Sequence, residues 1–429
     1  MAAGREQDIQ VLEAQADQAV EAGREADAAA FWGRILEIDP RHERSLSALG
    51  QLAFRGGDME AAKVAFERLT QVSGKDVLQW VNLAVVYRNL GDEAAEEETI
   101  RRALGVDAMD LMALLMRGNL YDRQNKRHQA ARAYGAAATI APPPERLHAA
   151  LRPLVAQAAA YRDKYDAEFA TFLDQGLQPQ YAELDGSELK RFRDSVDIMV
   201  GRKRRYDSRS ARYHFPELPA IEFFDRAQFP WLDAVEAATG VIREEFLEVL
   251  RGEDGFTPYI QYPPDEPQNQ WVELNNSPRW SAFHLIEMSS LVQANAARCP
   301  QTMKILAGVP QPEMKGRTPS AMFSLLKPKT RIPAHTGVTN ARLVTHLPLI
   351  IPGGCGFRVG NDTREWIPGN AWVFDDTIEH EAWNESDKPR VVLIFDIWHP
   401  HLTAAERRMI TALSSAMEAF VGDAGGFEL

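Results

Sequence analysis

"PAHTGVTNARLVTHLPLIIP", residues 333–352, decides the fold of the C-terminal half, because two histidines stand in a stretch that otherwise alternates between apolar and polar residues. Such alternation is typical of a β-strand with one face turned to a core. His335 lies directly before the alternating part, and His346 lies within it. Polar side chains that face a core are unfavourable unless they bind something, so both histidines are candidates for a binding site.

The neighbouring sequence predicts further short strands. From Ala321 onward, apolar runs are separated by Gly and Pro, in the order AMFSLL, ARLVTHLPLII, GFRVG, TREWI, NAWVFDD, HEAW and RVVLIFDIW. Short strands at this spacing are typical of a β-sandwich or a small jelly-roll barrel. We therefore predict a β-domain over residues 213–402, followed by a C-terminal helix and tail over residues 403–429.

The first third of the chain repeats every 34 residues. Pro40, Gly74, Ala108 and Pro142 have this spacing, and each follows an Ala-rich amphipathic stretch. A fixed period of this length is typical of stacked helical hairpins. Small and large residues recur at equivalent points of the second helix of each hairpin, namely Ala28 and Trp32, Ala62 and Phe66, and Ala130 and Tyr134.

These residues resemble tetratricopeptide repeats over residues 10–142, and an Ala-rich helical bundle is the alternative. The resemblance implies an α-solenoid that binds a peptide or protein partner. Three prolines at 142–144 end the repeats, because proline cannot continue a helix. Residues 143–212 then form a predicted helical linker that contains the basic segment GRKRRYDSRSARY, residues 201–213.

Composition excludes several classes of partner. The chain has 48 basic and 61 acidic residues and a formal charge of -13, which disfavours nucleic acid and anionic membranes. The start lacks the pattern of a secretory signal, and no apolar run reaches the ~18 residues of a membrane span. Only Cys299 and Cys355 occur, so a single bridge is the most that can form. We therefore expect a cytoplasmic protein.

A second histidine lies 45 residues after His335. His380 stands at the start of a predicted strand, whereas His335 stands directly before one, and imidazoles from two barrel strands are a usual start of a non-haem Fe(II) site. The carboxylate that commonly completes such a site lies two residues after the first histidine, where this chain has Gly337. For the pair alone, two ordinary polar residues are an equal alternative. Arg390, at the start of the last strand, adds a guanidinium that can bind a dicarboxylate.

Taken together, residues 213–402 resemble the aspartyl/asparaginyl β-hydroxylase family of Fe(II)- and 2-oxoglutarate-dependent oxygenases. The matching blocks are PAHTGVTNARL, HLPLIIP, the run from Trp366 to Asp376, EHEAWN and the run from Arg390 to Pro400, and FPELP at Phe215 matches more loosely. The resemblance implies a multidomain α + β chain. Its repeat solenoid is followed by a double-stranded β-helix of the jelly-roll or cupin type, with flanking helices.

Carried over residue by residue, the resemblance makes His335 and His380 the iron ligands. Gly337 stands where other oxygenases have an acid, and this absence is a family trait. The open coordination position is then filled by water or by halide. A turn that needs a positive φ is the structural alternative for this glycine.

The resemblance also assigns the cosubstrate contacts. Ser324 and Arg390 match the positions that hold the outer carboxylate of 2-oxoglutarate, and His346 matches one that holds the carboxylate nearer the metal. The family has an arginine where this chain has Val344. Two alternatives follow: the contact to the inner carboxylate is weakened, or Arg342, which shares a strand face with Val344 and His346, reaches in instead.

The implied activity is hydroxylation of an unactivated C–H bond with O2, and with release of succinate and CO2. The β-carbon of Asp or Asn in a peptide or protein is the expected target, and a free amino acid or an acyl chain is the alternative. Val344 favours a non-catalytic adaptor as a second reading of the chain. A third is a sensor that binds 2-oxoglutarate without consuming it.

Several residues receive structural predictions only. Asp375 and Asp376 are predicted to close a turn, and His399 to be a surface or capping residue. Thr403 and Glu406 have the spacing of a capping box for a final helix. The apolar face of that helix is predicted to consist of Met409, Leu413, Met417 and Phe420.

Overall fold

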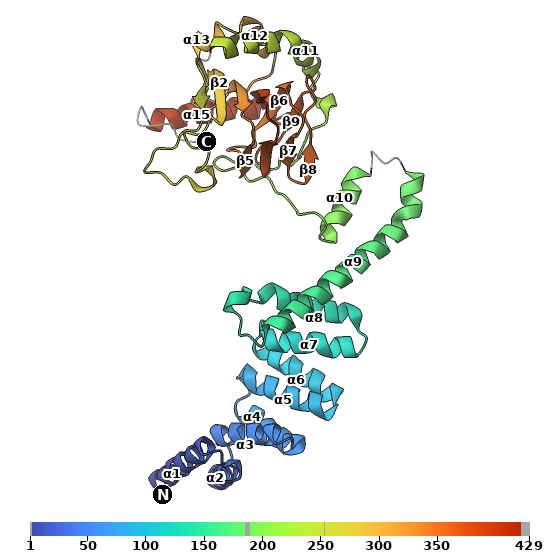
Figure 1. Cartoon of the computed structure of the whole chain (residues 1–429), viewed down its shortest axis with the longest axis vertical. Helices are drawn as coiled ribbons and strands as arrows, with labels where there is room; N and C mark the ends of the chain where they lie inside the picture. The colour runs from blue at the N-terminus through green and yellow to red at the C-terminus, as the bar shows by residue number, and fades with distance from the viewer. Residues whose placement is uncertain (1, 185–188, 253, 422–429) are drawn as a thin grey trace. The chain divides into compact units, whose positions relative to one another are not determined.

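The computed structural model describes residues 2–184, 189–252 and 254–421 (Figure 1). The chain divides into two compact units, residues 1–196 and 197–429. The first unit is helical, and the second contains all the strands.

The first unit is a series of α-helices in which, as far as residue 183, each one packs against the next along the chain. Asp58, Asp76, Asp92 and Asp110 each cap the start of one of these helices, as when Asp58 accepts a hydrogen bond from the backbone N–H of Ala61 at 2.9 Å. Within the described residues no helix is long and apolar enough to cross a membrane. The helices are α1 (Ala2–Glu21), α2 (Glu25–Ile38), α3 (Glu43–Arg55), α4 (Met59–Val72), α5 (Val77–Leu90), α6 (Glu93–Val106), α7 (Leu111–Arg123), α8 (Arg127–Ile140), α9 (Arg152–Glu183) and α10 (Lys190–Met199), the last of which crosses into the second unit.

Close packing of glycine against an aromatic ring recurs in the first unit. A Cβ atom on Gly50 would lie 2.9 Å from the ring of Phe66, and one on Gly118 would overlap the ring of Tyr134. The two glycines are two 34-residue periods apart, as are the two aromatic residues. Small residues therefore let paired helices approach, and the predicted helical repeats are confirmed.

The second unit contains two antiparallel sheets. In the larger one, the strand order is β1-β2-β4-β11-β6-β9, with β3 paired to β2, and the smaller has the order β5-β10-β7-β8. This confirms the prediction that β-sheets follow the helical repeats. The strands are β1 (Thr257–Pro258), β2 (Trp280–Glu287), β3 (Ser290–Leu291), β4 (Ala321–Leu326), β5 (Thr330–His335), β6 (Arg342–Ile350), β7 (Cys355–Val359), β8 (Asp362–Arg364), β9 (Trp372–Phe374), β10 (His380–Asn384) and β11 (Arg390–Trp398).

The two faces of the larger sheet pack against different partners. One face packs on α11 (Leu232–Ala237), α12 (Thr239–Gly252) and α14 (Pro300–Leu306), with a core that includes Phe246 and Phe395. The opposite face shares a second core with the smaller sheet, to which it contributes Val344 and Val392 and the smaller sheet contributes Phe357 and Ala382. Because successive strand residues point to opposite faces, every second residue of β6 and β11 is directed between the sheets.

Loop contacts fix the segment that opens the second unit. The side-chain oxygen of Asn340 accepts from the backbone N–H of Phe215 at 2.7 Å, and its amide nitrogen donates to the Phe215 carbonyl at 2.8 Å. Just before this point, the backbone N–H of Arg209 donates to Thr377 and that of Ala211 donates to Gly337. Part of the basic segment, predicted to belong to a linker, thus lies along the loops that flank His335 and His380.

The C-terminal helix α15 (Ala404–Val421) begins at the predicted capping box. Glu406 accepts a hydrogen bond from the backbone N–H of Thr403 at 2.7 Å, and the Thr403 hydroxyl oxygen accepts from the Glu406 N–H at 3.2 Å. The prediction of the helix start is therefore confirmed.

The predicted apolar face of α15 is wrong. Ile410 and Ser414 are the buried positions, and the Ser414 hydroxyl accepts from the backbone N–H of Lys315. The side of α15 that packs against the rest of the unit is therefore not its most apolar side. It is the side that carries Ser414, which is small and forms the hydrogen bond. Three of the four residues of the predicted face are exposed, namely Met409, Leu413 and Phe420.

Both cysteines are free and buried. Cys299 belongs to the core beneath the larger sheet, and the Cys355 thiol donates to the side-chain oxygen of Asn384. The bridge that the sequence left open does not form.

Exchange of Gly118 for alanine tests the helix packing in the first unit. The added methyl group overlaps the Tyr134 ring, so we expect the free energy of unfolding to fall by about 1–3 kcal/mol in urea titrations. Gly176 in α9 is the control, because nothing lies within 4 Å of a Cβ atom there. Gly176→Ala should keep or raise stability, by up to about 1 kcal/mol. Equal effects of the two exchanges would contradict the packing account.

Candidate active site

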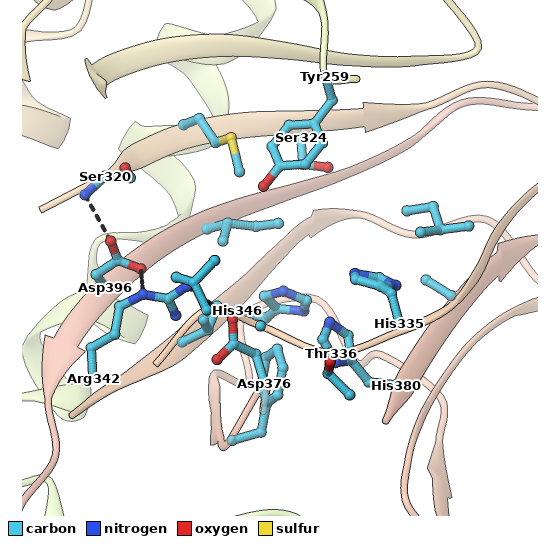
Figure 2. Close-up of a pocket in the computed structure, with 18 of the residues that line it drawn as sticks. Tyr259, Ser320, Ser324, His335, Thr336, Arg342, His346, Asp376, His380 and Asp396 are labelled. Atoms are coloured by element: carbon cyan, nitrogen blue, oxygen red, sulfur yellow. Dashed lines mark hydrogen bonds and ion pairs between the residues drawn. The ribbon is translucent and has the colours of Figure 1, made fainter. Parts of the chain in front are cut away.

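A cavity of about 410 Å³ lies between the two sheets of the second unit (Figure 2). Its volume is in the range of small-molecule sites. Strand alternation directs polar side chains into it from both sheets. All six predicted site residues line this one cavity, namely Ser324, His335, Arg342, His346, His380 and Arg390.

The antiparallel pairing of β5 and β10 brings the two predicted metal ligands together. His335, the last residue of β5, is the register partner of His380, the first residue of β10. Their ring centroids are 4.1 Å apart. Residues 45 positions apart in the sequence thus become direct neighbours at the cavity wall, as Figure 2 shows.

Backbone carbonyls fix the tautomer of both rings. The Nδ1 of His335 lies 2.8 Å from the carbonyl oxygen of Pro333, and the Nδ1 of His380 lies 3.0 Å from that of Ile378. A carbonyl oxygen only accepts, so each Nδ1 carries the proton and donates. The lone pair of each imidazole is therefore on Nε2, which is the arrangement seen in metal-binding histidines.

Both rings are neutral near neutral pH. Burial, and then the neighbouring His380, lowers the pKa of His335 to about 3. Burial lowers the pKa of His380 to about 4. A metal ion therefore has no proton to displace from either ring.

Gly337 leaves no room for a third ligand at its position. A Cβ atom there would overlap the carboxylate of Asp376, and the Gly337 N–H donates to the Asp376 carbonyl at 2.6 Å. Gly337 is not among the glycines with positive φ, so that explanation is wrong and space is the reason. Among the described residues, no group of three or more His, Cys, Asp or Glu side chains could hold a metal. The donor set thus fits a metal with two protein ligands and open positions.

Arg390 is a buried cation without a counter-charge. It is 1% exposed, and no ion pair to it occurs among the described residues. Its closest polar contacts are the carbonyl and hydroxyl oxygens of Ser324, at 3.5 and 3.4 Å, and its Nε has no partner. Its guanidinium carbon lies 4.8 Å from the centre of the Trp366 ring. Burial lowers the pKa of Arg390 to about 10, so this site favours an anion.

Ser324 lies on β4 opposite Val392 of β11. Its hydroxyl is fully buried and accepts a hydrogen bond from the indole Nε1 of Trp280 at 3.1 Å. The hydroxyl proton is therefore free to turn toward a ligand held by Arg390.

His346 lies between the His335–His380 pair and Arg390. Its ring lies 4.8 Å from that of Phe374, which in turn lies 5.7 Å from the His380 ring. On the other side, it lies 6.0 Å from the Trp366 ring that stacks on Arg390. Burial and the positive charge of Arg390 hold the pKa of His346 well below its ordinary value, and its Nδ1 has no partner.

Arg342 differs from Arg390, because two carboxylates accompany it. Its Nη2 donates to Asp376 at 2.9 Å, and its Nε lies 3.5 Å from Asp396. Burial alone would lower its pKa, but the two acids raise it on balance. Figure 2 shows this group on the side of His346 away from His335. Val344 also lines the cavity and adds no polar atom.

The two acids were not predicted as site residues. Asp375 caps the turn as expected, because its carboxylate accepts from the backbone N–H of Thr377 at 2.9 Å, but Asp376 faces the cavity instead. Asp396 is the only charged residue inside the apolar run VVLIFDIW, and this signal could have identified it.

The predicted surface position of His399 is wrong, but its predicted capping role is supported, because its Nδ1 accepts a hydrogen bond from the backbone N–H of His401 at 3.2 Å. This residue is fully buried rather than at the surface, and its ring packs edge-on against Phe224 at 5.3 Å. It is not among the residues that line the cavity.

The two arginines allow a stability test. Arg390→Met removes an uncompensated buried charge, so we expect the free energy of unfolding of the ligand-free protein to rise by about 1–3 kcal/mol. Arg342→Met leaves two buried acids without their cation and should lower it by about 3–5 kcal/mol. Urea unfolding at neutral pH measures both. Destabilisation of equal size in the two variants would contradict the assignment of charges.

Comparison with known proteins agrees with this geometry. Residues 236–400 match the aspartyl/asparaginyl beta-hydroxylase family, and residues 80–108 match a tetratricopeptide repeat. Aspartate beta-hydroxylase domain-containing protein 2 of Xenopus tropicalis is 30% identical over 205 residues, which cover 47% of this chain and 53% of the relative. Aspartyl/asparaginyl beta-hydroxylase of Homo sapiens is 26% identical over 377 residues, with 83% and 43% covered.

A third relative is the ornithine lipid ester-linked acyl 2-hydroxylase of Rhizobium tropici. It is 34% identical over 180 residues, which cover 41% of this chain and 60% of the relative. The chain thus spans about half the length of these relatives. The chain therefore joins helices that match a tetratricopeptide repeat to a domain that matches the aspartyl/asparaginyl beta-hydroxylase family over residues 236–400.

Proposed function

We propose that this chain is an Fe(II)- and 2-oxoglutarate-dependent oxygenase that uses O2 to hydroxylate an unactivated C–H bond, with release of succinate and CO2. The supporting observation is a neutral histidine pair with free Nε2 atoms that shares one cavity with a buried, unpaired arginine. The hydroxylase names of the relatives agree with this chemistry.

In this proposal, His335 and His380 hold the iron through their Nε2 atoms. When bound, the iron and 2-oxoglutarate supply the oxidation, and the protein supplies position and the exclusion of water. The carbonyls of Pro333 and Ile378 keep both imidazoles in the ligating tautomer. Gly337 keeps a metal position free of protein ligands.

The cosubstrate site follows from the distribution of charge. Arg390 and Ser324 hold the outer carboxylate, and His346 contacts the carboxylate nearer the metal. Val344 and Ile394 line the same cavity and exclude water from it. A carboxylate at Arg390 would supply the counter-charge that the protein lacks there.

The two sheets are proposed to form a double-stranded β-helix. In support, β11 lies between β4 and β6 in the larger sheet, and β10 lies between β5 and β7 in the smaller one. From β4 onward, successive strands thus mostly alternate between the two sheets, strands distant in the sequence pair within each sheet, and the shared core lies between the sheets.

The proposed target is the β-carbon of Asp or Asn in a peptide or protein. The family name supports this class of substrate, and the repeat helices suit recruitment of a peptide or protein. An acyl chain is the second candidate substrate, because one relative is the acyl 2-hydroxylase of Rhizobium tropici. The fixed tautomers of His335 and His380 favour a metal-binding enzyme over a non-catalytic adaptor, because an adaptor does not require a free Nε2 on either ring.

Replacement of His380 tests the proposed chemistry. In air with Fe(II), we expect the parent protein to convert 2-oxoglutarate to succinate, followed by NMR, and His380→Ala to be slower by about 100-fold or more because a metal ligand is lost. His284→Ala is the matched control, since this histidine of β2 does not line the cavity. Equal rates in the parent and in His380→Ala would contradict the metal assignment.

A further inference from the structure

The far end of the cavity forms a second polar site. Arg390 and Asp396 lie six residues apart on β11, on the same face of the strand. At about 3.3 Å per residue, their backbones are separated by roughly 20 Å. Arg342, Asp376 and Asp396, named here the far cluster, lie at the Asp396 end of the cavity.

The positive charge of Arg342 in the far cluster is balanced by the two carboxylates beside it. Arg342 contacts both Asp376 and Asp396. Asp396 is otherwise satisfied, because its Oδ2 accepts from the Thr318 hydroxyl at 2.8 Å and from the backbone N–H of Ser320 at 2.9 Å. The guanidinium is thus matched by two carboxylates, and a third carboxylate would meet repulsion.

Two polar atoms of the far cluster are buried and have no hydrogen-bond partner among the residues that the structure describes. They are Nη1 of Arg342, which can only donate, and Oδ1 of Asp376, which accepts. Their parent groups are already joined by the 2.9 Å hydrogen bond between Nη2 and Oδ2, and the Asp376 side chain is only 9% exposed. Buried groups left unsatisfied are unfavourable, so this donor and acceptor are suited to a ligand that offers the complement of both.

The far cluster also lies next to the histidine pair. The Asp376 carboxylate fills the space beside Gly337, two residues after His335. Figure 2 shows Asp376 between Arg342 and His380. A substrate side-chain group bound by the far cluster would therefore lie close to the proposed iron site, where the neighbouring β-carbon is hydroxylated.

We propose that the far cluster binds the substrate through an uncharged carboxamide and rejects the corresponding carboxylate. The carboxamide oxygen accepts from Nη1 of Arg342, and its NH2 group donates to Oδ1 of Asp376. A carboxylate has only acceptors, so it would face Asp376 without a proton to share. This inference rests on the proposed function and narrows its substrate class to the side-chain amide.

A pair of capped amino acids tests this inference. The parent protein, loaded with Zn(II) in place of iron and with 2-oxoglutarate, is titrated with N-acetyl-asparagine N-methylamide and with the matching aspartate compound. Saturation-transfer NMR reports the binding of both probes and of 2-oxoglutarate. We expect the asparagine probe to bind at least about tenfold more tightly, because a site built to pair a donor and an acceptor rejects a ligand that lacks one of them.

Two acid-to-amide exchanges sharpen the test. Asp376→Asn removes the repelling charge, so the preference for the asparagine probe should fall by about tenfold. Asp375→Asn is the matched control, because that carboxylate caps Thr377 and does not line the cavity. It should keep the preference of the parent. Binding of 2-oxoglutarate by each variant shows that its fold is intact.

The outcomes separate the two proposals. Equal binding of the probes, tighter binding of the aspartate probe, or no binding of either while 2-oxoglutarate binds would each overturn the carboxamide inference. Failure to bind 2-oxoglutarate would instead overturn the proposed function. An unchanged preference in Asp376→Asn would show that Asp376 does not select the substrate.

Discussion

The buried guanidinium of Arg390 is the constraint on which the arrangement of the cavity depends. A cation in the core with no acidic partner lowers the stability of the fold, and such a group in a cavity is a candidate for ligand binding. The structure surrounds Arg390 with a serine hydroxyl, an indole ring and a neutral histidine, none of which carries a compensating charge. The cavity is therefore prepared for an anion at this end.

The two ends of the cavity differ in charge although both contain an arginine. Within the described part of the chain, no carboxylate pairs with Arg390, whereas two pair with Arg342. The histidine pair lies on the smaller sheet, and both arginines lie on the larger one. One ligand can therefore be held by charge and the other by hydrogen bonds, within one enclosed space, without competition between them.

Much of this arrangement could be predicted from the sequence. Local sequence signals indicate the short strands, the histidines near strand ends and Arg390 at the start of the last strand. Strand alternation then directs these side chains into the space between the two sheets. The contacts that depend on tertiary packing could not be predicted from the sequence. Asp376 looks like a turn residue, and only the pairing of β5 with β10 brings it against Gly337. The docking side of α15 is set by Ser414 and Ile410 against a neighbouring segment, which periodicity alone cannot show.

Anaerobic titration with Fe(II) and 2-oxoglutarate tests the central claim most directly, because a chelate on iron gives a visible charge-transfer band without turnover. The account predicts this band in the parent protein, its loss in His380→Ala, and a weaker affinity for 2-oxoglutarate in Arg390→Met. A folded parent protein that binds neither iron nor 2-oxoglutarate would contradict it, and the cavity would then need another ligand to explain the buried charge of Arg390.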